Sequence, residues 1–190
     1  HFKSGRAGLQ NVSIAENGGK LIGIMGGSGS GKSTLLNVLN GTEKPSSGQV
    51  LINGINVHEQ PHLVEGVIGY IPQDDLLMED LSVYENLYYA AQLCFAHYTT
   101  HQIIEKVDNL LSNLNLTDIK DLKVGSALQK IISGGQRKRL NIGLELLREP
   151  TILFVDEPTS GLSSRDSENI MDLLKELTLR GKMIFVVIHQ

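Results

Sequence analysis

The sequence predicts an α/β fold in which a helical subdomain is inserted into a core with a mostly parallel sheet. Three short and continuously apolar runs lie at Leu21–Met25, Ile152–Val155 and Ile184–Ile188. Runs of this kind are typical of strands that are buried on both faces, as in parallel sheets. Helical patterns separate the runs, and strands that alternate with helices indicate an α/β domain.

Two of the helical patterns are preceded by a capping signal. Thr99 and Gln102 have the spacing of a capping box, in which two side chains three residues apart satisfy the first backbone N–H groups of a helix. Ser82 and Glu85 repeat this spacing ahead of an aromatic-rich segment. A further helical pattern follows the second apolar run, and Gly181 is its expected stop.

The segment 76–147 lacks a convincing buried strand and carries mostly helical patterns. We therefore expect one domain over residues 1–190, with its core at 1–75 and 148–190 and the helical subdomain between them. The chain starts at His1 and ends directly after an apolar run. We interpret it as a piece of a longer protein, truncated at both ends.

The composition is that of an ordinary globular domain, with 41% hydrophobic and 20% charged residues, and it argues against disorder along the whole chain. A net charge of -4 gives no overall basic footprint, so no nucleic-acid partner is expected. Cys94 is the only cysteine, which rules out an internal disulfide and fits a reducing compartment. No run approaches the roughly 20 apolar residues of a membrane span.

A glycine-rich loop, Gly26–Ser33, follows the first predicted strand and precedes a helical segment. It matches the pattern G-x-x-x-x-G-K-[ST], whose glycines let backbone N–H groups point at phosphate oxygens while the helix adds its positive end. Lys32 would reach the β- and γ-phosphates of ATP, and Ser33 would bind Mg²⁺. A flexible glycine-serine turn is the alternative, which the flanking strand and helix disfavour. The expected nucleotide ligands here are Gly26, Gly27, Ser28, Gly29, Ser30, Gly31, Lys32, Ser33 and Thr34.

An acidic pair, Asp156 and Glu157, follows the second apolar run. A carboxylate at the C-terminal end of a buried parallel strand faces the ligand crevice, so Asp156 is expected to hold Mg²⁺. Glu157 is expected to orient or deprotonate the attacking water. An isolated Asp-Glu pair is commonly a surface feature, and the phosphate loop is what favours the functional interpretation. Together the two motifs predict the core of a P-loop NTPase, which is RecA-like.

The segment Ile132–Gln136 resembles the signature of ABC (ATP-binding cassette) ATPases, usually Leu-Ser-Gly-Gly-Gln, with isoleucine in the first position. A serine and two glycines that open a helix form a second anion site. The expected nucleotide contacts are Ser133, Gly134, Gly135 and Gln136. Ser133 and Gln136 also fit an ordinary capping box, which is compatible with that function. In the family, this segment closes over the ATP that a second cassette holds.

Other segments follow the order of the family along the chain. Residues 70–73 resemble the Q-loop, which implies that Gln73 contacts Mg²⁺ and the attacking water. Residues 158–162 resemble the start of the D-loop, and His189 resembles the switch histidine that contacts the γ-phosphate. The catalytic group that the resemblance implies is Lys32, Gln73, Glu157 and His189.

The stretches 136–143, 156–162 and 188–190 are similar to those of G-type ABC exporters and their bacterial relatives, whose cassettes usually share one chain with a transmembrane domain. The chain departs from the family at Ser163, where the D-loop usually continues with aspartate. The family also places an aromatic residue on the adenine, and Phe2 is the candidate, although aligning it requires a shift of one residue. An exposed terminal residue is the alternative for Phe2.

The leading interpretation is an ATPase motor that drives transport across a membrane. The resemblance implies a homodimer that closes around two ATP molecules, a transmembrane domain on the same chain, and a place on the cytoplasmic face of the cell membrane. A soluble ABC-type regulator without a membrane domain is the alternative. DNA-maintenance ATPases of the SMC kind are disfavoured, because Gln73 and Ser133 are only 60 residues apart and leave no room for their coiled-coil arms. Glu157 argues against a binding module without turnover.

Overall fold

The computed structural model describes residues 9–126 and 131–188. The chain divides into two compact units. The sheet unit runs up to Gln73, resumes at Pro150–Ser160 and continues from Leu174 onward. The helical unit consists of Asp74–Glu149 and Gly161–Leu173.

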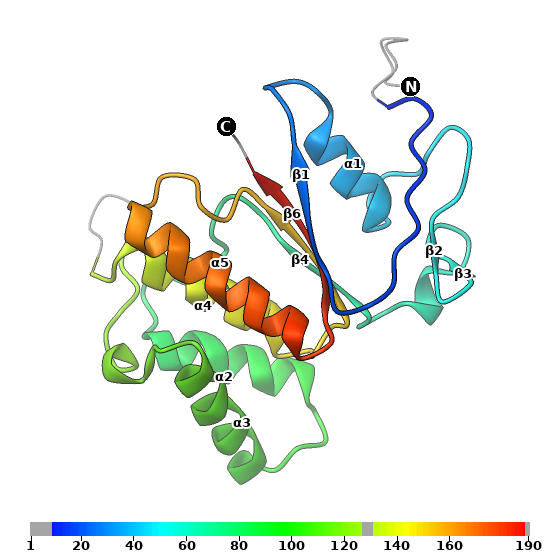
Figure 1. Cartoon of the computed structure of the whole chain (residues 1–190). Helices are drawn as coiled ribbons and strands as arrows, with labels where there is room; N and C mark the ends of the chain where they lie inside the picture. The colour runs from blue at the N-terminus through cyan, green and yellow to red at the C-terminus, as the bar shows by residue number, and fades with distance from the viewer. Residues whose placement is uncertain (1–8, 127–130, 189–190) are drawn as a thin grey trace. The chain divides into compact units, whose positions relative to one another are not determined.

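The sheet unit is built on four parallel strands in the order β1-β6-β5-β4 (Figure 1). The strands are β1 (Leu21–Met25), β4 (Ile68–Ile71), β5 (Ile152–Asp156) and β6 (Met183–Ile188). The three strands predicted from apolar runs are confirmed, with β5 and β6 each one residue longer. The fourth strand, β4, was not predicted, because only four residues with a glycine among them leave no distinct pattern.

One helix of the sheet unit follows the glycine-rich loop and packs on the sheet. Helix α1 (Lys32–Leu39) buries Leu36 completely, and Leu36 shares a core cluster with Phe154 of β5 and Phe185 of β6. The two phenylalanine rings stack with centroids 5.2 Å apart. Burial of these rings ties the helix to the middle of the sheet, which holds the preceding loop at one end of β1.

A short antiparallel hairpin and a 3-10 turn complete this unit. The hairpin joins β2 (Leu51–Ile52) to β3 (Ile55–Asn56) through Asn53 and Gly54, which both have positive φ, and the 3-10 turn η1 spans Pro61–Leu63. An Asn-Gly pair between apolar residues is the strongest short-range hairpin signal. The sequence therefore contained this hairpin, although it was not among the predicted elements.

The helical unit contains α2 (Val83–Cys94), α3 (Thr100–Asn113), the 3-10 turn η2 (Thr117–Ile119) and α4 (Gly134–Leu146). Helix α5 (Ser164–Leu179) begins in this unit. The predicted capping boxes at the starts of α2 and α3 are confirmed, with both reciprocal bonds present. Gly181, with φ of 91°, follows the end of α5 as expected.

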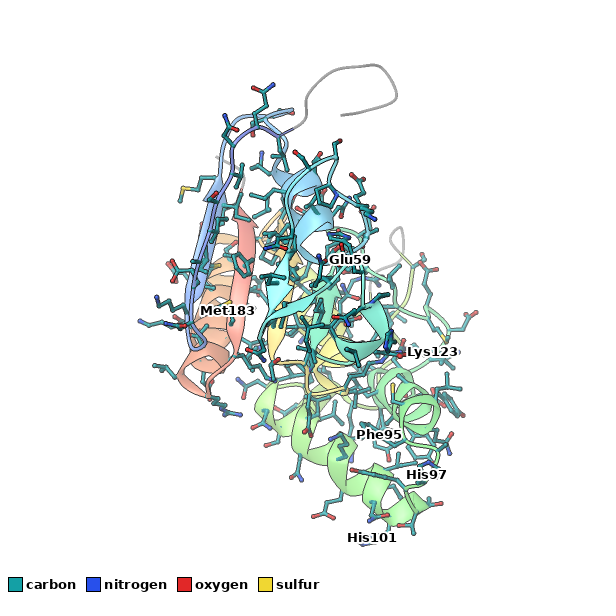
Figure 2. The ribbon with its side chains drawn as sticks, turned by 90° about the vertical axis from the view of Figure 1, so that its right-hand side faces the viewer. Glu59, Phe95, His97, His101, Lys123 and Met183 are labelled. Atoms are coloured by element: carbon teal, nitrogen blue, oxygen red, sulfur yellow. The ribbon has the colours of Figure 1, made fainter. Side chains whose placement is uncertain are left out.

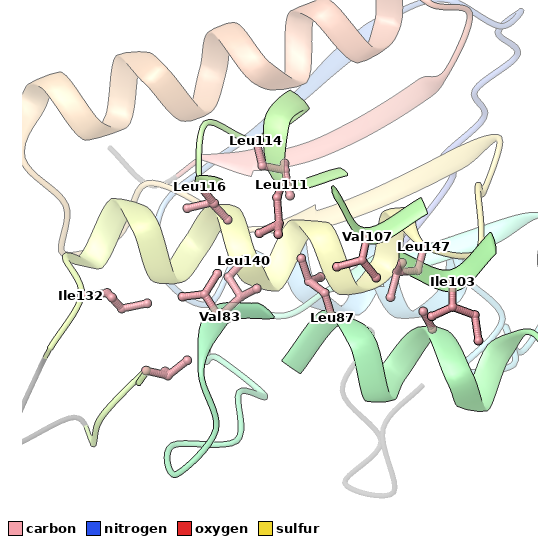
Figure 3. Packing of buried hydrophobic residues seen from close by; sticks show 12 residues of the cluster. Val83, Leu87, Ile103, Val107, Leu111, Leu114, Leu116, Ile132, Leu140 and Leu147 are labelled. Carbon is pink, nitrogen blue, oxygen red and sulfur yellow. The ribbon is translucent and has the colours of Figure 1, made fainter. Parts of the chain in front are cut away.

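The helices of this unit share one apolar core (Figure 3). Leu87 of α2 and Leu140 of α4 are fully buried, and Val107 of α3 joins them. Gly143 of α4 permits the close packing, because a Cβ there would lie 2.6 Å from a methyl carbon of Leu114. The cluster comprises Val83, Leu87, Ala91, Ile103, Val107, Leu111, Leu114, Leu116, Val124, Ile132, Leu140 and Leu147.

Polar contacts reinforce the helical unit at its edges. Arg137 is buried and donates to the Asp75 carboxylate at 3.0 Å and to the carbonyl oxygen of Gly125 at 2.7 Å. At the junction of α2 and α3, the Phe95 and Tyr98 rings stack, and the Lys106 ammonium lies 4.8 Å from the Phe95 centroid. Phe95, with His97 and His101, marks this junction in Figure 2. Among the described residues, no helix combines the length and apolarity that a membrane crossing requires.

Candidate functional site

The predicted nucleotide ligands of the core gather at one edge of the parallel sheet. Met25, the last residue of β1, pairs with Ile188, and Asp156, the last residue of β5, pairs with Val187. In β4, Ile71 pairs with the residue before Asp156. The carboxyl ends of all four strands therefore lie at the same level, which is where open α/β sheets bind ligands.

The glycine-rich loop leaves this edge directly after β1 and depends on its glycines. Gly29 and Gly31 have φ of 74° and 95°, a region that residues with a Cβ rarely adopt. A Cβ on Gly26 would lie 2.7 Å from the Ser30 hydroxyl oxygen. The Lys32 ammonium reaches back over the loop and donates to the carbonyl oxygens of Gly26 at 2.8 Å and of Gly27 at 3.0 Å.

Helix α1 begins at this loop without a side-chain cap. Gly31 is its N-cap, and no side chain accepts from the first backbone N–H groups. The first turn carries no acidic residue either. Helix starts of this kind attract anions, because the first N–H groups and the positive end of the helix dipole face outward. Ser33 in this turn is exposed, and its neighbour Thr34 is half-buried.

The acidic pair lies at the end of β5. Asp156 is buried, with 8% of its surface exposed. Burial raises the pKa of the Tyr70 phenol above its ordinary value, and the nearby Asp156 carboxylate raises it further. Tyr70 therefore stays protonated at neutral pH.

Glu157 has a backbone conformation that non-glycine residues seldom adopt. Its φ is 44°, and left-handed geometry costs an L-residue roughly 1–2 kcal/mol. Its backbone N–H donates to the carbonyl oxygen of Val187 at 3.2 Å, and its own carbonyl accepts from Ser160 at 3.1 Å. These bonds hold the sharp turn by which the chain leaves β5, and strain of this kind gathers at functional sites.

Three predicted ligands of the core remain, namely Gln73, Phe2 and His189. Gln73 is exposed and follows β4 by two residues, so it leaves the same edge of the sheet. Phe2 and His189 lie outside the described residues. The roles expected for these two side chains stay predictions.

The segment Ser133–Gln136 belongs to the helical unit and opens α4. Gln136 donates its backbone N–H to the Ser133 hydroxyl at 3.2 Å, and the Gln136 side chain accepts from the Ser133 backbone at 2.7 Å. The expected capping box is thus confirmed. Two glycines, Gly134 and Gly135, form the first turn between these side chains.

The donor set at the sheet edge fits a nucleotide with Mg²⁺. Five glycine and serine residues precede Gly31, and the N–H groups of a loop so rich in glycine can approach phosphate oxygens closely. Mg²⁺ prefers oxygen ligands, which the Ser33 hydroxyl, the Asp156 carboxylate and the Gln73 amide carbonyl can supply. Lys32 adds a cation on the loop itself.

One polar pair of the helical unit was not predicted. The Ser163 hydroxyl precedes α5 and bonds to both the backbone and the side chain of Asp166. A serine followed three residues later by an acidic residue is a capping signal, so the sequence contained the information.

Comparisons with known proteins agree with the geometry. The family model described as ABC transporter matches residues 9–160. The broad substrate specificity ATP-binding cassette transporter ABCG2 of Rattus norvegicus is 42% identical over 170 residues, which cover 88% of this chain and 25% of that protein. ABC transporter G family member 23 of Arabidopsis thaliana is 38% identical over 190 residues, which cover 96% of this chain and 30% of that protein.

A solved structure is similar over the whole chain. It is cbiO1 from Clostridium perfringens, described as part of the ABC transporter complex cbiONQ. The TM-score is 0.87 with 30% sequence identity, and the match covers 100% of this chain and 75% of the other. The chain spans 25–30% of the length of the two curated relatives named above.

Proposed function

The chain belongs to the ABC transporter family as an ATP-binding domain with ATPase activity, and on this premise we propose that it is the motor of a membrane transporter. In this proposal, two copies close around two ATP molecules and reopen after hydrolysis. One observation carries the proposal. The phosphate loop, Asp156 and the segment that leads from β4 to Gln73 all lie at one edge of a parallel sheet.

We propose that the core side chains divide the work of holding Mg-ATP. Lys32 would exchange its bonds to the loop carbonyls for oxygens of the β- and γ-phosphates. The Ser33 hydroxyl, Asp156 and Gln73 would hold Mg²⁺, which neutralises phosphate charge when bound. Phe2 would stack on the adenine, and His189 would contact the γ-phosphate.

Glu157 is the proposed general base. Its backbone is held in a left-handed turn at the end of β5, so its side chain starts from a fixed position beside the buried Asp156. In this role its carboxylate orients a water molecule and accepts a proton from it as the water attacks. The exposure of Glu157 is intermediate, which leaves its carboxylate accessible to water.

The proposed homodimer follows from a division between two helix starts. The glycine-rich loop and α1 belong to the sheet unit, whereas Ser133–Gln136 and α4 belong to the helical unit. If the segment Ser133–Gln136 of each copy covers the nucleotide of the other, an isologous pair satisfies both sites at once. ATP would then favour the closed pair through its higher affinity for that state.

The proposed boundaries and location extend this function. We propose a nucleotide-binding core at 1–75 and 148–190 and a helical subdomain at 76–147. A transmembrane domain on the same chain would place the cassette on the cytoplasmic face of the cell membrane. The relatives named above are described as transporters, and that description supports the proposal.

Replacement of Glu157 by glutamine tests the motor cycle. The glutamine keeps the shape of the side chain but removes the base, and loss of a general base commonly lowers the rate by about 10²–10⁴-fold. We expect the Glu157→Gln cassette to bind Mg-ATP and to accumulate as a dimer, which light scattering measures as a doubled mass. With ADP the same variant should stay monomeric.

The control is Glu168→Gln, which changes an exposed glutamate on α5 and should behave as the parent. An intact Glu157→Gln cassette that stays monomeric at saturating Mg-ATP and high protein concentration would contradict the closing of two copies. Phosphate release by Glu157→Gln at the parent rate would contradict the role of Glu157 alone.

A soluble ABC-type regulator is the second candidate, because the cassette motifs are common to both classes. The adjoining polypeptide decides between them. Apolar runs of about 20 residues in that polypeptide favour the transporter. A second cassette without such runs favours the regulator.

A further inference from the structure

Ser163 fixes the orientation of the Asp166 side chain. Its hydroxyl oxygen accepts from the backbone N–H of Asp166 at 3.1 Å, and its hydroxyl proton is donated to the Asp166 carboxylate at 2.8 Å. A serine that directly precedes a helix and bonds to the third helical N–H is an N-cap. Because the same hydroxyl serves as donor and acceptor, it fixes both the start of α5 and the Asp166 carboxylate.

Asp166 lies against the first turn of α4. A Cβ on Gly135 would come within 2.4 Å of the Asp166 Oδ1 atom and within 2.9 Å of the Asp166 Cβ atom. A side chain of any size at position 135 would therefore push α4 away from Asp166. Glycine is the residue that allows such a close approach of backbone to a neighbour.

The other glycine of this turn faces the same segment. A Cβ on Gly134 would lie 3.0 Å from a methyl carbon of Leu162. Both glycines of the segment 133–136 thus pack on residues 162–166, inside the helical unit. Their absence of side chains serves packing within one chain, in addition to the approach of a phosphate.

The Asp166 carboxylate also lies where two helices begin. It is in the first turn of α5, and it contacts the first turn of α4 through Gly135. A carboxylate is stabilising at the positive end of a helix dipole. In Figure 1 the starts of these two helices lie on the same side of the helical unit.

We propose that Asp166, oriented by Ser163, is a positioning residue for the segment 133–136. It sets where that segment lies on residues 162–166, and thereby how the segment meets the nucleotide of a second copy. This inference rests on the proposed function, in which Ser133–Gln136 covers the ATP of the partner. Ser163 is then an adaptation to Asp166, although the family usually carries aspartate at position 163.

The proposal predicts that restoring the family residue impairs the protein. In Ser163→Asp, the new carboxylate can accept from the Asp166 backbone but cannot donate to the Asp166 side chain, and the two carboxylates repel. We expect the ATP concentration for half-maximal turnover in the intact protein to rise about fivefold, the order of effect that two like charges about 4 Å apart in water produce. Ser163→Ala should raise it less, since it removes the bonds without adding repulsion.

The double variant Ser163→Asp with Asp166→Asn is the matched rescue. The amide of asparagine can donate to the new carboxylate, and the repulsion is gone. We expect its half-maximal ATP concentration to return to the parent value. Ser163→Thr keeps the hydroxyl and should resemble the parent throughout.

Two further measurements separate positioning from stability. Labelled-nucleotide affinity at low protein concentration, where copies are apart, should be equal in all variants. A purely structural role would lower the thermal midpoint and leave the half-maximal ATP concentration of the folded protein unchanged.

The outcomes distinguish this inference from the function on which it rests. If Ser163→Asp reaches half-maximal turnover at the same ATP concentration as the parent, the positioning role is overturned while the proposed function stands. The same holds if the double variant does not return to the parent value. A parent protein that hydrolyses no ATP above the Lys32→Ala background overturns the proposed function, and the inference with it.

Discussion

Helices α1 and α4 both begin in glycine-containing segments that are expected to face phosphate, yet they begin in different ways. The N-cap of helix α1 is Gly31, and no side chain caps this helix. The N-cap of helix α4 is Ser133, and a complete capping box already occupies the N–H of Gln136. Helix α1 therefore presents its first backbone N–H groups to an anion. In helix α4 the side chain of its own N-cap already accepts from one of these N–H groups.

We interpret this difference as two kinds of predicted phosphate contact. The uncapped start of α1 has Lys32 beside it and is equipped to bind phosphate within one chain. The start of α4 is stable without a ligand, so a phosphate there adds to an existing structure. Such a site suits a contact that forms and breaks with each cycle, as the proposed closing of two copies requires.

The largest expected effect is at the uncapped start. Lys32→Ala removes the ammonium that lies over the loop, and bonds from charged groups contribute up to about 3 kcal/mol. We expect the affinity for Mg-ATP to fall on the order of 100-fold in a titration with fluorescent nucleotide. The control is Lys20→Ala, which changes an exposed lysine paired with Glu16. Unchanged affinity in Lys32→Ala would remove this side chain from its assigned role.

A smaller effect is expected at the capped start. Ser133→Ala removes one bond of the capping box and should lower the free energy of unfolding by about 1 kcal/mol, as urea denaturation measures. Nucleotide affinity of separate copies should not change, because the phosphate loop is intact. Ser133→Thr keeps the cap and serves as the control. A loss of affinity in separate copies of Ser133→Ala would erase the distinction between the two helix starts.

The smallest effect concerns pH. The α2 and α4 capping boxes share one geometry, but Glu85 of α2 ionises and Gln136 of α4 does not. Hydrogen bonds from the backbone and side chain of Ser82 lower the pKa of Glu85 below its ordinary 4.5. A lowered pKa means that the bond stabilises the fold above pH 4.5 and that this contribution disappears as the pH falls through the folded-state value.

We therefore expect Glu85→Gln to melt below the parent at pH 7 and the gap to be narrower at about pH 3, which lies under the ordinary pKa. Differential scanning calorimetry at both pH values measures this. Gln136→Glu reverses the comparison and should make the α4 cap sensitive to pH. Equal gaps at the two pH values would show that the ionised form of Glu85 contributes nothing.

The local features of this protein follow from short stretches of its sequence. Continuous apolar runs located β1, β5 and β6. Most residues of β5 and β6 are buried, because strands covered on both faces exclude polar residues. Side-chain spacing located the capping boxes, since both partners lie within one helical turn. The phosphate loop could also be predicted from the sequence, because its backbone conformation depends on its own glycines.

Contacts between segments distant in sequence depend on the tertiary structure. Strand β4 has no strong pattern of its own and exists through its pairing with β5, some 80 residues later. The same is true of Gly135 and Asp166, which meet because α4 and α5 begin side by side. The two partners of a capping box lie within four residues of each other, so the sequence shows both. A contact across 31 residues depends on how the intervening chain packs. Local sequence patterns therefore predict capping partners, whereas long-range contacts are seen only in the folded chain.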